Sequence, residues 1–169
     1  ISDSTMSKII DYCELDLGVK IVITASQDKF EIDKVESILS KAKSNPMNFS
    51  GRLSLKQTAA LNKKAKLFIG VDTSIMHVSA ANNVPVLAFF GPSGACHWGP
   101  WDNTLMESGY TKINGPQFMG MHRVISEARA CQPCGKDGCN GSKISDCLMN
   151  LDFEKIKSNI MKMLDEQNY

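Results

Sequence analysis

The chain has 169 residues, of which 43% are hydrophobic and 22% charged, a composition typical of a soluble globular domain with its own hydrophobic core. Its 19 basic and 18 acidic side chains leave a formal net charge of +1, without the basic excess expected of a nucleic-acid-binding protein. The longest apolar runs have about 6 to 8 residues, too few to cross a bilayer, and no secretory signal is recognisable, so we expect a cytoplasmic protein.

The predicted elements, taken in chain order, alternate between helices and short strands. Apolar residues recur at helical spacing from Ser4 to about Leu17, and Gly18 ends this helix. The β-branched run 19–24 predicts a buried strand. Later in the chain we expect helices at 30–42, 54–64, 75–81 and 153–164, and strands at 46–49, 67–71, 85–90 and 104–108. A Gly- and Cys-rich stretch from about 109 to 147 carries no predicted element.

This alternation predicts an α/β fold with a Rossmann-like, mostly parallel sheet covered by helices on both faces. Ligands of such sheets bind at the carboxyl ends of the strands. The loops that follow Thr24, Val71 and Phe90 are therefore the candidate ligand loops, and all three contain unusual residues.

The segment 70–81 (GVDTSIMHVSAA) is the most informative of these. A predicted strand runs directly into Asp72, Thr73 and Ser74, which are residue types that cap helices, and then into a helix. The amide groups and positive dipole end of such a helix form an anion site, usually for phosphate. Two hydroxyls would add hydrogen bonds, and His77 lies one turn further on. The alternative is an ordinary turn with a capping Asp72 and a core histidine.

The loop after the next predicted strand (FGPSG, residues 90–94) contains Gly and Pro, which permit a sharp turn and close approach of backbone to a ligand. A plain loop is the alternative. Trp98 and Trp101 follow it. Two such side chains would flank a sugar, meet another domain, or close the end of the core.

Together these motifs are similar to the donor domain of glycosyltransferase family 9, which contains the lipopolysaccharide heptosyltransferases. The similarity is carried by D-T-S-x-M-H-x-x-A-A within 71–81, P-V-x-x-F-F-G-P-S within 84–93, and W-G-P-W at 98–101. It extends over nearly the whole chain, because the cysteine-rich stretch before the final helix also resembles many members. The resemblance implies the C-terminal half of a GT-B fold, in which residues 1–169 form a single nucleotide-sugar (donor) binding domain.

Carried over by position, the resemblance also assigns the donor site. The donor's diphosphate and heptose hydroxyls would be held by Asp72, Thr73, Ser74 and His77, with Gly91 and Pro92 in the neighbouring loop. Leu53 matches a position that contacts adenine, and Glu31 matches an acid that bonds ribose hydroxyls. The alternative for Glu31 is an exposed acid at a helix start. Family members usually have Gly where Ser74 stands.

Several parts of the family pattern are missing from the sequence. These are the first strand of the donor domain, a loop with a phosphate-pairing Lys, and the N-terminal acceptor domain that holds the expected catalytic base. We therefore assign no catalytic residue to this chain and expect it to be inactive alone. The full-length parent is expected to transfer heptose, with inversion and without a catalytic cofactor, from ADP-heptose to the inner core of lipopolysaccharide. Peripheral association of the parent with the inner membrane follows from such an acceptor.

The sequence also permits two other functions. One is a non-catalytic nucleotide-binding or assembly module with the same fold, and the other is a transferase of another ADP-sugar to an acceptor other than lipopolysaccharide. A flavodoxin-like or receiver domain is disfavoured, because the first predicted strand carries no acidic pair and the strand order would place Asp72 too late.

Four of the six cysteines crowd into the short subsegment 131–147, whereas Cys13 and Cys96 stand alone. The first two of the four have the spacing of zinc knuckles, and three nearby glycines permit the turns that tetrahedral coordination needs. A structural zinc site is predicted, with disulfides or free thiols as alternatives. Its candidate ligands are Cys131, Cys134, Cys139 and Cys147.

Overall fold

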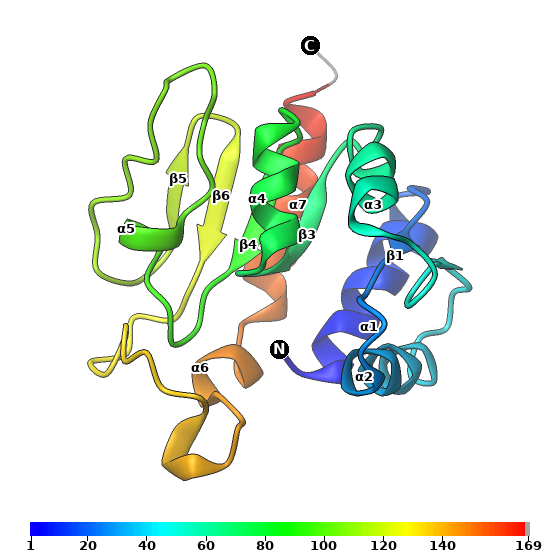
Figure 1. Cartoon of the computed structure of the whole chain (residues 1–169), viewed down its shortest axis with the longest axis horizontal. Coiled ribbons are helices and arrows are strands. Elements are labelled where there is room, and N and C mark those ends of the chain that lie inside the picture. Colours follow the sequence, from blue (N-terminus) through cyan, green and yellow to red (C-terminus); the bar gives the residue numbers. More distant parts are fainter. Residues whose placement is uncertain (168–169) are drawn as a thin grey trace. The chain divides into compact units, whose positions relative to one another are not determined.

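The computed structural model describes residues 1–167, which form two compact units. One unit comprises Ser2–Thr58, and the other begins at Ala59 and includes Ile1. Each unit holds its own sheet, and the chain passes from the first unit to the second within helix α3 (Leu55–Asn62) (Figure 1). This division was not expected from the sequence, in which helices and strands alternate across Thr58 without a linker.

The first unit begins with helix α1 (Asp3–Asp11), whose first turn is capped by the Ser2 hydroxyl. The helix continues as a single π-helical turn, η1 (Tyr12–Asp16). It ends, as predicted, at Gly18, whose φ of 64° is available to glycine without strain.

Helix α2 (Lys29–Leu39) is capped by Asp28 and is tied to α1 through the carboxylate of Asp3. Hydrogen bonds from Lys34 and Ser37 lower the pKa of Asp3 to about 2. The two helices of this unit are therefore joined by a charged contact as well as by apolar packing.

The sheet of the first unit consists of two parallel strands, β1 (Val22–Ile23) and β2 (Met47–Asn48). The predicted strand 19–24 is thus largely extended chain, and the expectation that it is buried is wrong. Val22 is 37% exposed, because β1 has a single partner strand and its sheet is too small to be covered on both faces.

The second unit is built on a four-stranded sheet in the order β3-β4-β6-β5. Strands β3 (Phe68–Val71), β4 (Val86–Phe89) and β6 (His122–Ile125) run parallel, and β5 (Gln117–Met119) pairs antiparallel with β6. All four residues of β4 are buried, as expected of a central parallel strand.

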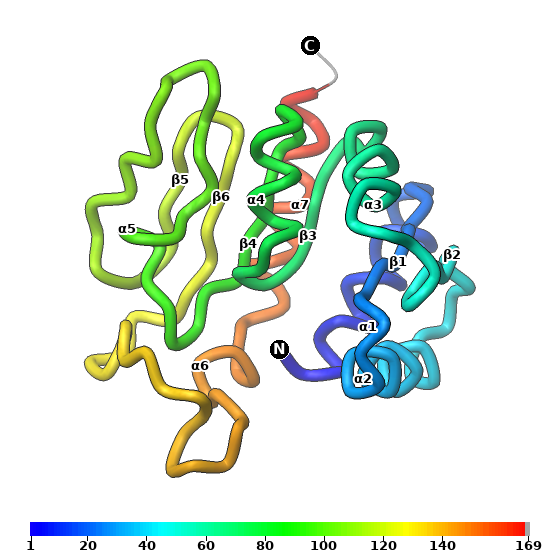
Figure 2. The backbone as a smooth tube through the Cα atoms, viewed as in Figure 1, coloured from blue at the N-terminus to red at the C-terminus, as the bar shows by residue number. Residues whose placement is uncertain are grey.

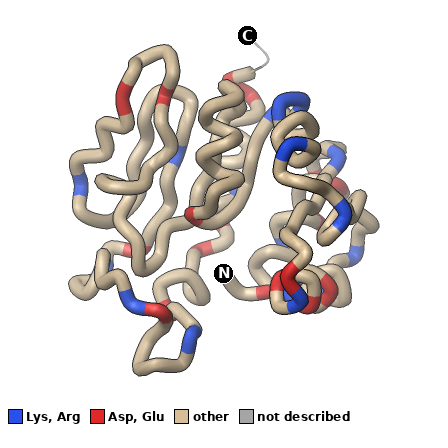
Figure 3. The backbone as a smooth tube through the Cα atoms, in the orientation of Figure 1, with Lys and Arg blue, Asp and Glu red and all other residues tan. Residues whose placement is uncertain are grey.

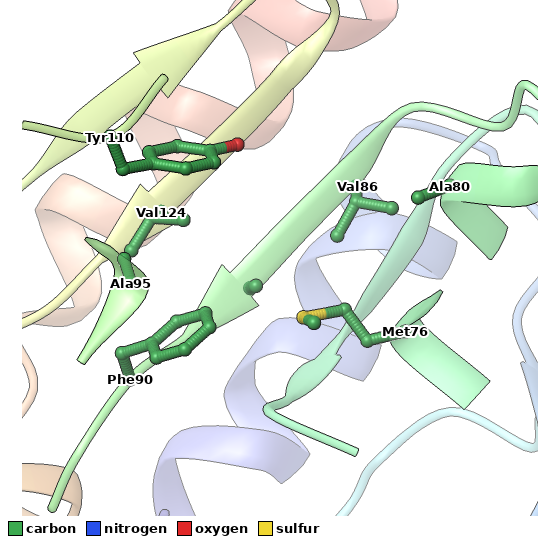
Figure 4. Packing of buried hydrophobic residues seen from close by; sticks show 8 residues of the cluster. Met76, Ala80, Val86, Phe90, Ala95, Tyr110 and Val124 are labelled. Carbon is green, nitrogen blue, oxygen red and sulfur yellow. The ribbon is translucent and has the colours of Figure 1, made fainter. Parts of the chain in front are cut away.

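Helices cover both faces of this sheet (Figure 1). On one face, helix α4 (Ser74–Ala81) places Met76 and Ala80 against a fully buried cluster from the strands, which includes Val86, Phe90 and Val124 (Figure 4). On the other face, Arg123 of β6 bonds Asn159 and Glu166 at helix α7 (Phe153–Asp165). The predicted α/β fold with a mostly parallel sheet between two layers of helices is confirmed.

Strands β5 and β6 lie in the stretch for which the sequence predicted no element. The sequence of β6 (HRVI) mixes basic and apolar residues, so neither an apolar run nor strict alternation marks it. Three short helices in the loops were not predicted either: α5 (Ala95–Trp98), the 3-10 turn η2 (Cys139–Gly141) and α6 (Asp146–Met149).

The predicted strand 104–108 is wrong. The carboxylate of Asp102 accepts hydrogen bonds from the backbone N–H groups of Thr104 and Leu105 and folds the chain into a turn. Met106 then adopts a φ of 59°, which no regular strand tolerates. The segment keeps a single β-bridge, between Asp102 and Glu107.

Candidate functional site

The turn between β3 and α4 forms the centre of the candidate site. The β3–β4 ladder extends one step past β3, through a hydrogen bond from the Asp72 N–H to the Phe89 carbonyl at 3.3 Å. Thr73 is the N-cap residue of α4, with extended backbone, and its side chain makes no capping hydrogen bond. The Met76 N–H donates to the Thr73 carbonyl, so within the described residues the N–H groups of Ser74 and Ile75 are left for an external acceptor. The positive end of the helix dipole favours an anion there.

His77 stands one turn into α4 and faces the same side as Asp72. Its Nε2 lies 3.9 Å from Oδ1 of Asp72, and 43% of its side chain is exposed. The alternative of a core histidine is wrong, because the core position on this turn is taken by Met76, which is completely buried. Helix α4 thus buries one face and presents Thr73, Ser74 and His77 on the other.

The loop that follows β4 leaves the same edge of the sheet, because Val71 and Phe89 are partners in the parallel ladder. Gly91 is buried in this loop, and a Cβ there would lie 2.6 Å from Cγ of Leu148 on α6. The absence of a side chain at Gly91 is thus explained by packing. Any contact of Gly91 and Pro92 with a donor stays a prediction.

The Gly91-Pro92 loop is also fixed by the cysteine-rich segment. Nε2 of the buried Gln132 donates to the Gly91 carbonyl at 2.9 Å, and the Gly135 N–H donates to the Pro92 carbonyl at 3.0 Å. These two hydrogen bonds could not be predicted from the sequence, because a contact between residues some forty positions apart leaves no local pattern.

The two residues assigned to the nucleoside lie in the first unit. Glu31 stands in the first turn of α2, and its carboxylate accepts a hydrogen bond of 2.8 Å from the Ser26 N–H. Leu53 is half-buried in the link between β2 and α3. Both are accessible, and their assignment to ribose and adenine stays a prediction.

Trp98 and Trp101 lie in and after helix α5. They are 58% and 45% exposed, so the alternative that they close the end of the core is wrong. The space beneath them is filled instead by Tyr110, which packs against the backbone of Gly99. A role beside a sugar or another domain remains open to both tryptophans.

The four clustered cysteines line one small cavity of about 20 Å³, and all are free thiols. Within residues 1–167, no three His, Cys, Asp or Glu side chains already form a group that could hold a metal ion. The thiol of Cys147 is buried at the start of α6, and desolvation raises its pKa. The zinc site therefore stays a prediction, and the alternative of disulfides is not seen among these four cysteines.

Comparison with known proteins identifies the family. The family model for glycosyltransferase family 9 (heptosyltransferase) matches residues 12–124, which is more than half of the chain. The chain belongs to this family. The matched range includes every donor-site residue assigned above and stops before the clustered cysteines.

Individual relatives agree with the family assignment. The chain is 32% identical over 91 residues to lipopolysaccharide heptosyltransferase 3 of Escherichia coli, an alignment that covers 53% of this chain and 27% of that protein. Its fold matches the crystal structure of a family 9 glycosyltransferase of Veillonella parvula with a TM-score of 0.71 and 20% identity, over 98% of this chain and 42% of that one. ADP-heptose LPS heptosyltransferase II of E. coli gives a TM-score of 0.69 and 19% identity, with 98% and 41% covered. The chain therefore spans less than half the length of these proteins.

Within the part of the chain that the structure describes, no helix combines the length and apolar character needed to cross a membrane.

Proposed function

We propose that this chain is the donor-binding domain of a heptosyltransferase and that it holds ADP-heptose for inverting transfer to the inner core of lipopolysaccharide. The observation that carries the proposal is the uncapped start of α4, with the Thr73 and Ser74 side chains exposed beside His77. Membership of family 9 and the activities named for the relatives support the choice of donor and acceptor.

Different residues of the turn suit the diphosphate and the sugar of the donor. Amide groups, hydroxyls and an imidazole donate hydrogen bonds and suit phosphate oxygens. The Asp72 carboxylate only accepts, and it would repel a phosphate. We therefore assign Thr73, Ser74 and His77 to the diphosphate, and Asp72 to sugar hydroxyls, with His77 within reach of both.

Transfer itself requires a base that removes a proton from the acceptor hydroxyl as it attacks the anomeric carbon. No residue of this chain is assigned that role, so in this proposal the base and the acceptor contacts belong to a further part of the parent enzyme. The chain alone binds the donor without completing transfer. The proposal places the parent in the cytoplasm, with its acceptor at the inner membrane.

Calorimetric titration with ADP-heptose tests the proposal. Asp72→Ala and His77→Ala should each weaken binding about tenfold or more, because a hydrogen bond to a charged group contributes about 1.5–3 kcal/mol. Asp165→Ala, an exposed acid in the last turn of α7 on the opposite face of the sheet, is the matched control and should bind like the unsubstituted chain.

The results of these titrations distinguish the proposed function from its alternatives. Tight binding that neither Asp72→Ala nor His77→Ala weakens would place the donor elsewhere. A folded chain with no affinity for ADP-heptose or ADP would favour the non-catalytic assembly module, while tighter binding of another ADP-sugar would favour a different donor.

A further inference from the structure

The four clustered cysteines lie in the segment between β6 and α7, which has no part in the proposed donor site. The backbone from the end of β6 to the start of α7 makes an extended excursion through η2 and α6 (Figure 2). Residues from both ends of this excursion meet at the small cavity. Its lining consists of Pro92, Arg129, Cys131, Cys134, Lys136, Gly138, Cys139, Ser145 and Cys147.

The side chains that line the cavity favour a thiophilic metal ion as its ligand. Four sulfur atoms are soft donors, and no carboxylate or imidazole lines the cavity within the described residues. Soft thiolate sets prefer zinc and similar thiophilic cations to magnesium or calcium. The cavity volume of about 20 Å³ accepts one ion or one water but no larger group.

The charged residues around the cavity also favour a metal ion bound by thiolates. Four thiolates around one divalent cation carry a net charge of −2, and Arg129 and Lys136 supply two positive charges at the cavity wall. Arg129 is held in place by Glu127 and by the carbonyl of Asp146. Acidic residues lie among the basic ones in this segment (Figure 3), so the two cations are not part of a general basic surface.

The cysteines do not yet form a coordination sphere, but three of them are free to close on a common point. Cys131 and Cys134 are exposed outside regular helices, and Cys139 begins the short turn η2. Gly135 and Gly138 lie between Cys134 and Cys139 with φ of 63° and 88°, and each cysteine side chain reorients by rotation about χ1. Cys147 is fixed and buried in α6, where it would anchor the site.

We propose that Cys131, Cys134, Cys139 and Cys147 bind one structural Zn²⁺ ion that fastens the cysteine-rich segment beneath the donor loop. The segment already holds that loop through Gln132 and Gly135, so the ion would stabilise a contact that exists in the fold. The site lies outside residues 12–124, and it does not depend on the proposed function.

The test uses the whole chain, purified under reducing conditions, stripped of metal and titrated with Co²⁺ and then Zn²⁺. One equivalent of Co²⁺ should give the intense near-ultraviolet bands of cobalt–thiolate bonds and the visible bands of tetrahedral cobalt, and one equivalent of Zn²⁺ should remove them. Cys131→Ser and Cys147→Ser should each lose stoichiometric binding. Cys96→Ser, which changes a half-buried cysteine that does not line the cavity, should retain it.

Two results would overturn the proposal. A reduced, folded chain that gives no thiolate bands with Co²⁺ has no such site, whatever the variants do. Loss of binding by Cys96→Ser as severe as that by Cys147→Ser would show that the ion is held by a different set of ligands. Neither result bears on ADP-heptose binding, which is measured separately at the α4 turn.

Discussion

Gly91 lies in the loop that follows β4 and packs against the side chain of Leu148. Gly91→Ala would place a methyl carbon 2.6 Å from Leu148 Cγ, inside a buried site. Overpacking of this kind costs about 1–3 kcal/mol, so we expect a lower free energy of unfolding in urea. A second substitution, Leu148→Ala, should recover part of this loss when combined with Gly91→Ala.

The double variant tests whether the loss of stability in Gly91→Ala comes from its contact with Leu148. If Gly91→Ala leaves the unfolding midpoint unchanged, or if Leu148→Ala adds its own full cost to it, the two side chains are not in conflict. In that case the glycine serves the donor loop in some other way.

Single residues of the candidate site could be predicted because their signals are local. Asp72, Thr73 and Ser74 stand between an apolar run and a helical repeat, and that order alone predicts a helix start after a strand. The exposure of His77 and the missing cap at Thr73 could not be predicted, since both depend on how α4 rests on the sheet. The contact between Gly91 and Leu148 joins distant positions and has no local signature.

Helix α7 illustrates the same contrast at the level of an element. Its apolar residues recur at helical spacing, so its existence and its inward face could be predicted from the sequence. Strand β6, on which it rests, could not, because a central strand of four residues that includes His122 and Arg123 carries neither pattern. Tertiary pairing with β4 determines that strand more than its composition does.

The packing of α7 can be tested with two adjacent positions. Ile160 is fully buried against the sheet, whereas Met161 is 46% exposed. Ile160→Ala should lower the free energy of unfolding by about 2–5 kcal/mol, because it leaves a cavity in the core. Met161→Ala should change it by less than about 1 kcal/mol. Chemical denaturation followed by circular dichroism measures both, and equal effects would mean that α7 does not cover the sheet as described.

At the scale of the whole molecule, the chain is a family 9 glycosyltransferase segment that spans less than half the length of its relatives. Its fold class could be predicted from the alternation of elements, and its family from motifs now placed at the carboxyl edge of the larger sheet. The division into two units could not be predicted, because it rests on the separate pairing of β1 with β2.

In the proposed function, the start of α4 binds the diphosphate of the donor. Its most direct test is to add ADP to the ¹⁵N-labelled chain and follow every backbone amide by NMR. We predict that the largest shifts fall on residues 73–77, and that they are absent with adenosine, which has no phosphate. Shifts of equal size with adenosine, or an ADP-bound chain in which residues 73–77 do not move, would contradict it.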